Sequence, residues 1–289
     1  MKILHCYLCG GRDFQTRTGK VRDNSDLEVL ECLECGLVFL DSQDHIAEDY
    51  YKNSKMHGSE PDYEKWRVGC QRDDRRRIRF LSEKLADKSI LDFGCGVGGF
   101  IELSKNLCRS VYGYEPEIAL RKFFKERNLN VFHDFYSMIK SGKKFDLITA
   151  FHVIEHLKDP AKTLLDLSFL LKQEGEIIIE TPSSSDALLS LYESDSFQNF
   201  TYWSNHLYLF NSKTIEKLSK SAGLALNWVE NIQRFPISNH LHWLSKGLPS
   251  GHLEWSFLDS PELSLAYEES LASIGATDTV IASFKKFEK

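Results

Sequence analysis

The stretch ILDFGCGVGGF, residues Ile90–Phe100, decides the fold of this chain. Its apolar start predicts a buried strand and its glycines a tight turn, and the apolar residues Ile101, Leu103 and Leu107 then follow at helical spacing. Glycine suits such a turn because a Cβ forbids the backbone angles that the turn needs, and because a ligand approaches the backbone closely there. The spacing also satisfies the GxGxxG pattern of dinucleotide sites, so the glycines alone leave the ligand open.

Two carboxylates near this turn narrow the choice of ligand. Asp92 stands two residues before Gly94, where it would repel the phosphate of a dinucleotide and attract a cationic amino acid group. Glu115 directly follows a second short strand, Ser110–Tyr114, and lies 21 residues after Gly94, close to where a ribose-binding carboxylate is expected. An adenosine that carries a positively charged, phosphate-free tail fits both carboxylates.

With these residues the chain resembles the class I methyltransferases that use S-adenosylmethionine. Their first motif reads much like LDFGCGVGG, and their second strand ends in an acid like Glu115. The resemblance covers roughly residues 81–232 and implies an α/β fold with a Rossmann-like, seven-stranded sheet. It also implies that Asp92, Gly94, Gly96 and Glu115 hold S-adenosylmethionine; a turn without a ligand is the alternative.

Two later strands carry further candidates for the cofactor site. A short third strand is expected at Asn130–Phe132, and the acid and aromatic that follow it lie beside the adenine ring by resemblance, with an ordinary loop as the alternative. The fourth strand, Phe145–Phe151, is apolar on both faces, as a parallel strand covered by helices requires. The additional cofactor candidates at these strand ends are Asp134, Phe135, Phe151 and His152.

Glu155, His156 and His206 are the candidates for catalysis. Related methyltransferases often carry a similar Glu-His pair after the fourth strand, some near metal or substrate and many only to shape the pocket. The aromatic segment Phe197–Phe210 is similar to a region of the sugar C-methyltransferases that begin with a zinc-binding domain, in which a Tyr-x-Glu-His segment supplies a histidine base. Residues 203–206 read WSNH, so the histidine is kept and the tyrosine and glutamate are replaced.

Two C-x-x-C pairs near the N-terminus predict a metal site. Cys6 and Cys9 are separated by 22 residues from Cys32 and Cys35, and each pair runs into glycine. Four thiolates at this spacing suit one tetrahedral, structural zinc, and the few apolar residues nearby would need its binding energy to fold. A redox pair or coincidental cysteines are the alternative. Residues 1–41 carry five Lys or Arg against seven Asp or Glu, which is the wrong sign for nucleic acid.

Composition limits the remaining function classes. The formal charge of −6 argues against a nucleic acid partner. No apolar run reaches the 18 residues of a membrane helix, and the segment before the first cysteine is too short for a secretory signal, so we expect a cytoplasmic protein without a membrane partner.

The sequence predicts three parts: a zinc ribbon at 1–42, a helical linker and cap at 43–80, and a methyltransferase domain at 81–289. In the linker, five arginines lie within Arg72–Arg79, either on a solvated helix face or as a clamp for an acidic substrate. Residues 236–275 are expected as a helix-containing insertion between strands six and seven, a lid or a dimer contact, with its histidines packed inside.

The expected function is methyl transfer from S-adenosylmethionine to a small acceptor. The zinc ribbon and His206 favour a carbohydrate or nucleotide-linked sugar, methylated on carbon or oxygen, with His206 as general base or as a group that orients the acceptor. One alternative is a quinone-type or other aromatic hydroxyl. Another is an inactive binding or scaffold protein whose ribbon grips a partner.

Overall fold

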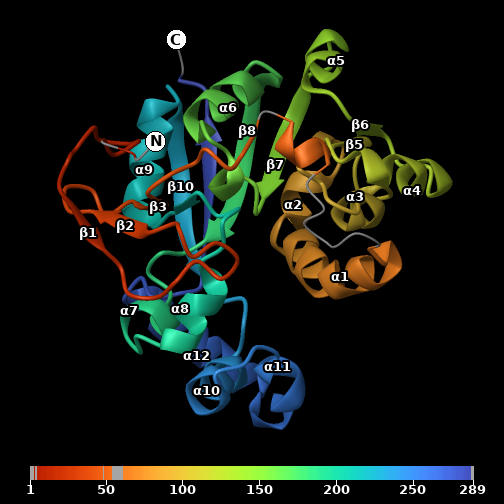
Figure 1. The fold of residues 1–289 in the computed structure, drawn as a ribbon. Helices are drawn as coiled ribbons and strands as arrows, with labels where there is room; N and C mark the ends of the chain where they lie inside the picture. The colour runs from red at the N-terminus through yellow and green to blue at the C-terminus, as the bar shows by residue number, and fades with distance from the viewer. Residues whose placement is uncertain (1–2, 4, 48, 54–60, 288–289) are drawn as a thin grey trace. The chain divides into compact units, whose positions relative to one another are not determined.

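The computed structural model describes residues 3, 5–47, 49–53 and 61–287 (Figure 1). Seven strands of the described chain form one mixed sheet: β4 (Ser89–Phe93), β5 (Ser110–Tyr114), β6 (Val131–Phe132), β7 (Phe145–Phe151), β8 (Leu171–Pro182), β10 (Ala225–Ile232) and β11 (Thr279–Lys285). Their order is β10-β11-β8-β7-β4-β5-β6. The predicted seven-stranded α/β sheet is therefore confirmed, with the last strand of the chain beside the sixth.

The chain divides into two compact units, which are described separately. Unit 1 comprises Met1–His45, Ile154–Ala161 and Glu180–Ala282, and unit 2 comprises Ile46–Val153, Lys162–Ile179 and Ser283–Lys289.

Unit 2 contains the strands on either side of the glycine turn. β4 pairs in parallel with β5 and with β7, and β5 pairs in parallel with β6. The register places Asp92 opposite both Gly113 and Thr149. Because carboxyl ends of parallel strands meet at one edge of a sheet, the turn after β4 and the acid after β5 come together there.

Helices of unit 2 cover these strands. They are α1 (Tyr63–Phe80), α2 (Ser82–Leu85), α3 (Gly99–Ser104), η2 (Ile118–Leu120), α4 (Arg121–Glu126), α5 (Phe135–Lys140) and most of α6 (Pro160–Ser168), and the unit also holds η1 (Tyr50–Lys52). Asp62 caps α1 by accepting a hydrogen bond from the Lys65 N–H at 2.9 Å. In Figure 1, α1 lies alongside α3, the helix that leaves the glycine turn. Part of the predicted linker, residues 48 and 54–60, lies outside the described residues.

Unit 1 contains a second, four-stranded antiparallel sheet. Its strands are β1 (Phe14–Thr16), β2 (Val29–Cys32), β3 (Val38–Leu40) and β9 (Tyr208–Leu209), in that order. The first three belong to residues 5–45, here called the cysteine-rich segment, whereas β9 follows His206 in the aromatic segment 197–210. The cysteine-rich sheet is therefore completed by a strand from far along the chain.

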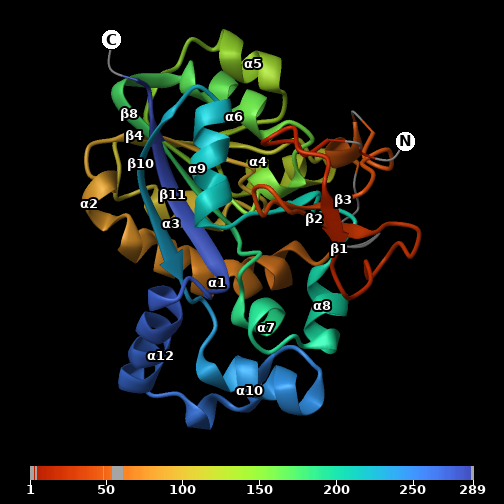
Figure 2. The same cartoon turned by 90° about the vertical axis from the view of Figure 1, so that its left-hand side faces the viewer.

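The helices of unit 1 include those of the predicted insertion. They are η3 (Ile154–His156), α7 (Ala187–Ser190), α8 (Asp195–Thr201), α9 (Ser212–Ser221), α10 (Ile237–Lys246), α11 (Gly251–Glu254), η4 (Ser256–Leu258) and α12 (Pro261–Ser273). In Figure 2 the insertion leaves the end of β10 as α10 and returns through α12 to β11, so the helix expected at its end is present.

The insertion histidines pack against polar partners. His240 is buried, its Nδ1 lies 2.7 Å from the Tyr267 hydroxyl, and burial lowers its pKa to about 4. His242 Nδ1 donates to the Leu248 carbonyl oxygen at 2.8 Å. Both are therefore buried, hydrogen-bonded packing residues. Among the described residues, no helix combines the length and apolarity needed to cross a bilayer.

Candidate functional site

The glycine turn after β4 holds its shape through positive backbone angles and close contacts. Gly94, Gly96 and Gly98 have φ values of 74°, 51° and 78°, which side chains disfavour. A Cβ on Gly94 would lie 2.5 Å from Val153 Cγ2, and one on Gly99 would lie 2.2 Å from Asp74 Oδ2. Glycine is therefore required in this turn both by the backbone angles and by the close approach of neighbouring side chains.

Asp92 is a buried carboxylate beneath this turn. The Thr149 hydroxyl, brought opposite by the β4–β7 register, donates to its Oδ1 at 2.8 Å. Burial raises the pKa of Asp92 to about 7, although the Thr149 hydrogen bond and the Arg77 charge act in the opposite direction. A buried carboxyl poised near neutral pH is stabilised in its ionised form by a cation, so this side chain suits a positively charged ligand group.

Glu115 is tied to the same turn by backbone hydrogen bonds. The Gly96 N–H donates to its Oε2 and the Glu117 N–H donates to its Oε1, both at 3.0 Å. Burial raises the pKa of Glu115 to about 7 against the effect of these two donors. The two predicted acids therefore lie at adjacent strand ends and share one environment.

Aromatic rings line the ends of β4 and β5. Phe93 and Tyr114 stack with centroids 4.7 Å apart, and Phe135 meets them edge-on at 6.1 and 6.0 Å. Asp134 caps α5 by accepting from the Ser137 N–H at 2.7 Å. The structure thus brings Phe135 to the two acidic strand ends and gives Asp134 a local capping role.

Phe151 and His152 follow the end of β7. The Phe151 ring is buried, packs edge-on against Phe100 at 5.2 Å and lies under the Arg77 guanidinium at 4.5 Å. His152 has a positive φ of 55°, so the backbone bends sharply after the strand.

Glu155, His156 and His206 form a second polar group, in unit 1. One carboxylate oxygen and one imidazole nitrogen from each histidine all lie within 4.8 Å of one another. Glu155 is buried and its Oε2 accepts from the Thr181 hydroxyl at 3.2 Å. The structure therefore assembles all three predicted catalytic candidates, although 49 residues separate the histidines in sequence.

The tautomers of the two histidines follow from their hydrogen bonds. His156 Nδ1 lies 2.8 Å from the Asn205 carbonyl oxygen and His206 Nδ1 lies 3.3 Å from that of Thr201. Carbonyl oxygens only accept, so both Nδ1 atoms carry a proton, and in the neutral form of each ring the basic nitrogen is Nε2. Such a group can take a proton from an acceptor, and its donor set also suits a divalent cation.

The four predicted cysteine ligands converge at one point of unit 1. All four Sγ atoms lie within 4.8 Å of one another, and the Cys6–Cys35 and Cys9–Cys32 pairs are each 3.5 Å apart. Sulfurs around a tetrahedral zinc at about 2.3 Å lie about 3.8 Å apart. The Gly11 N–H points at Cys9 Sγ at 3.4 Å, which further suits a thiolate. The donor set therefore fits zinc.

Comparison with known proteins settles the family. A family model described as "Methyltransferase domain" matches residues 66–227, which is more than half of the 289 residues. The chain belongs to this methyltransferase family. Together with the fold, this makes it an S-adenosylmethionine-dependent methyltransferase, as the glycine turn and the two acids predicted.

Its relatives and structural neighbours agree. The methyltransferase is 23% identical over 176 residues to a protein named "Ubiquinone biosynthesis O-methyltransferase" from Coxiella burnetii (strain Dugway 5J108-111), covering 56% of this chain and 75% of the relative. It is 35% identical over 114 residues to a protein of the same name from Pelagibacter ubique, covering 36% and 46%. Solved methyltransferases from Thermotoga maritima (17% identity, TM-score 0.51) and Archaeoglobus fulgidus (21%, 0.50) share the fold; each alignment covers 78% of this chain and 95% of theirs.

Three residues of α1 at the turn of this methyltransferase went unrecognised in the sequence. A Cβ on Gly96 would lie 3.3 Å from Trp66 Cζ2, Asp74 reaches Gly99, and Arg77 lies 3.3 Å from Asp74 with only 11% of its side chain exposed. Within the arginine run, Arg77 is thus neither on a solvated face nor in a substrate clamp. The spacing of residues 66, 70, 74 and 77 along one helix face is the signal that could have found them.

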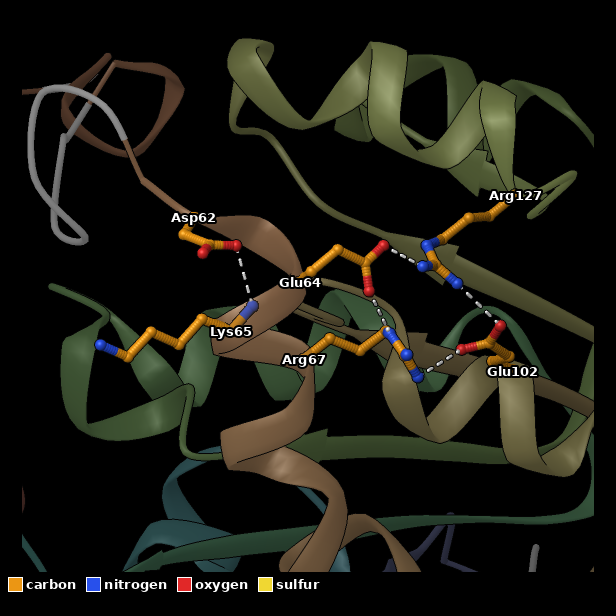
Figure 3. A network of polar contacts seen from close by, with 6 residues as sticks. All are labelled: Asp62, Glu64, Lys65, Arg67, Glu102 and Arg127. Carbon is orange, nitrogen blue, oxygen red and sulfur yellow. Dashed lines mark hydrogen bonds and ion pairs between the residues drawn. The ribbon is translucent and has the colours of Figure 1, made fainter.

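An ion-pair ring fastens α1 in this position (Figure 3). Arg67 lies 3.0 Å from Glu64 and 3.4 Å from Glu102 of α3, while Arg127, after α4, lies 3.1 Å from Glu102 and also pairs with Glu64. The ring joins α1 to α3, the helix that leaves the glycine turn, and to the C-terminal end of α4.

Proposed function

We propose that this methyltransferase methylates the hydroxyl oxygen of a small, quinone-type aromatic acceptor, with Glu155, His156 and His206 as the catalytic group. The observation that carries this proposal is the group itself: two imidazole rings, each hydrogen-bonded through Nδ1 to a backbone carbonyl oxygen, beside a buried carboxylate. A phenolic hydroxyl has a pKa of about 10, so its oxygen attacks a methyl group far better once a base removes the proton.

The names of the relatives support the aromatic acceptor over the carbohydrate acceptor that the sequence favoured. Both relatives are named for ubiquinone biosynthesis. The carbohydrate acceptor is still supported by the four converging cysteines and by the histidine at position 206, so nucleotide sugars are tested beside aromatic acceptors.

The proposed cofactor site lies in unit 2 around Asp92, Gly94, Gly96 and Glu115. When bound, S-adenosylmethionine supplies a methyl group on a cationic sulfur that needs no further activation. The buried Asp92 carboxylate would bind its cationic amino acid end and Glu115, which is hydrogen-bonded to the Gly96 N–H of the turn, its ribose hydroxyls. The Arg77 charge would favour the ionised form of Asp92. Phe135 offers a ring for the adenine.

We also propose that Cys6, Cys9, Cys32 and Cys35 hold one structural zinc. The sulfur separations and the amide directed at Cys9 support this role. All four protein ligands are sulfurs, which leaves no open position for a substrate and makes a catalytic role for this metal unnecessary.

Titration calorimetry and product analysis test these proposals in sequence. Zinc-loaded protein is titrated with S-adenosylmethionine, S-adenosylhomocysteine and NAD, and then incubated with labelled S-adenosylmethionine and either catechols or nucleotide sugars. We expect micromolar binding of the first two ligands and label on catechol oxygen. His206→Ala should lower the turnover number by about 10²- to 10⁴-fold without changing cofactor affinity.

His5→Ala is the matched control, because His5 is an exposed histidine of the same unit that accepts a hydrogen bond from Arg12. Its activity should equal that of the wild type. Label only on the sugars would overturn the aromatic acceptor and restore the carbohydrate one. Cofactor binding with no transfer to either class would favour an inactive, binding protein.

A further inference from the structure

The loop Cys6–Cys9, here called the first knuckle, is hydrogen-bonded to the residues that follow His156. Tyr7 stands between Cys6 and Cys9, and its hydroxyl donates to Asp159 Oδ1 at 2.5 Å and accepts from the Ala161 N–H at 2.9 Å. Its ring also packs against Tyr208 at 5.2 Å. A residue inside the metal-binding loop therefore fixes the stretch that begins with Glu155 and His156.

The loop between the first knuckle and the second knuckle, Cys32–Cys35, contacts the residues that precede His206. Asp23 accepts two hydrogen bonds from Ser204, one from its N–H at 2.9 Å and one from its hydroxyl at 2.7 Å. The Arg22 guanidinium lies 4.5 Å from the centre of the Trp203 ring, and His45 Nε2 donates to the Ser204 carbonyl oxygen at 2.7 Å. The segment that presents His206 is thus held on several sides by residues from the N-terminal 45.

The second knuckle continues into a strand that pairs with the residues just after His206. β3 begins three residues after Cys35 and pairs Val38 with Leu209 and Phe39 with Tyr208. The Leu207 N–H donates to the Glu155 carbonyl oxygen at 2.8 Å, so the two gripped stretches are also joined to each other. β9 is only two residues long, so β3 supplies much of what holds it in place.

From these contacts we infer that the cysteine-rich segment is the positioning element of the active site, and that Tyr7 and Asp23 are its positioning residues. Metal binding to the four cysteines stabilises the conformation of the two knuckles. The knuckles and the residues next to them contact residues 154–161 and 197–210. These two stretches position Glu155, His156 and His206. The inference rests on the proposed function of this group.

The physical reason is the small size of the segment. Few apolar side chains hold its three short strands together, and such modules depend on metal for their folded shape. Without metal, the Tyr7 and β3 contacts lose their support, and the histidines are freed to move away from Glu155. The proposed cofactor residues Asp92, Gly96 and Glu115 belong to unit 2 and take part in none of the contacts described above, so cofactor binding should survive.

Hydrogen exchange of the full-length, metal-loaded protein tests the coupling without any acceptor. Tyr7→Phe, which keeps the ring, and Asp23→Asn are compared with Tyr136→Phe, an exposed tyrosine of unit 2, and Asp26→Asn, an exposed acid of the same segment. We expect amide exchange in residues 154–161 and 197–210 to accelerate at least about tenfold in the first two variants and after chelation of the metal. Exchange in β4 and β5 should stay unchanged, which also shows that the variants are folded.

Kinetics provide the second readout. In Tyr7→Phe and Asp23→Asn we expect kcat to fall about tenfold or more, while the affinity for S-adenosylmethionine stays within about twofold; the two control variants should match the wild type. Unchanged exchange at 154–161 and 197–210 after chelation, or an unchanged kcat in both variants, would overturn the inference. If the wild type turns over no aromatic acceptor, the proposed function fails, whereas the exchange data still decide the coupling.

Discussion

Asp92→Asn should make the cofactor-free protein more stable and at the same time impair cofactor binding. Asp92 is buried, and burial raises the pKa of its carboxyl from an ordinary value of 3.8 to about 7. The folded protein therefore favours the neutral acid over the carboxylate. Asparagine has nearly the same shape, can still accept from the Thr149 hydroxyl, and is neutral at every pH.

The size of the effect follows from proton linkage. Between pH 3.8 and 7 the folded state holds a proton on Asp92 that the unfolded state has released, so the stability of the wild type falls as pH rises through this window and levels off above it. The full shift of about three pKa units corresponds to about 4 kcal/mol, and the part between pH 5 and pH 7 to about 3 kcal/mol. The stabilisation by Asp92→Asn should therefore be about 3 kcal/mol larger at pH 8 than at pH 5.

Urea denaturation of cofactor-free protein at pH 5 and pH 8 measures this difference directly. The control is Asp146→Asn. Burial opposes ionisation of Asp146, but the hydrogen bond from Lys172, together with those from the Ser89 N–H and Arg109, lowers the pKa of its carboxyl. Asp146 stays ionised in both states from pH 5 to pH 8, so its replacement should destabilise the protein equally at both values. If Asp92→Asn destabilised the protein by the same amount at both pH values, the reasoning about this buried acid would be refuted.

The remaining predictions concern the turn, its helix, the metal and the cofactor charge. Gly94→Ala should lower the free energy of unfolding in urea by at least about 2 kcal/mol, and Gly223→Ala by about 1 kcal/mol. Both glycines have positive φ, but only at Gly94 would the new Cβ lie 2.5 Å from a neighbouring atom. Equal losses of unfolding free energy would contradict this steric argument. Arg77→Lys should weaken S-adenosylmethionine binding about tenfold by calorimetry, since lysine keeps the charge but loses the flat contact with Phe151; unchanged affinity would remove Arg77 from the site. Chelation should lower the thermal midpoint by at least about 5 °C and zinc should restore it, and a midpoint insensitive to both would argue against a structural metal. Cofactor binding at pH 6 should release protons as Asp92 ionises. The binding heat should therefore change with the ionisation enthalpy of the buffer. A binding heat independent of the buffer would mean that Asp92 does not contact a cation.

Local sequence signals predicted most of the fold. The strand at Phe145–Phe151 was expected with the bounds it has, because an apolar run of this length buried on both faces has no other stable place in an α/β domain. The glycine turn and its two acids were found for the same reason: strand, turn and helix lie within about a dozen consecutive residues. Asp92 and Glu115 come together because adjacent parallel strands bring their ends to one edge.

Contacts between distant segments could not be predicted in this way. A run of arginines predicts a solvent-exposed helix face, because the sequence does not show what each side chain contacts. Arg77 is buried because α1 packs beside the glycine turn. The pairing of β3 with β9 joins residues about 170 positions apart and leaves no periodic trace in either segment. His156 and His206 come from distant segments, and the sequence does not show that the β3–β9 pairing and the Leu207–Glu155 hydrogen bond bring the chain together beside them.

The two acids of the glycine turn also explain why this version of the motif suits a cation. Acidic neighbours add to the effect of burial: Asp92 contributes to the raised pKa of Glu115, and Asp74 to that of Asp92. A pyrophosphate would add negative charge to a site that already favours protonated acids, and would bind only by keeping them neutral. A cationic ligand does the reverse, because it lets the buried carboxylates ionise and gains their attraction in a medium of low dielectric constant. The cost of burying two ionised carboxylates therefore favours a cationic ligand, and the glycines alone would not distinguish it from a dinucleotide.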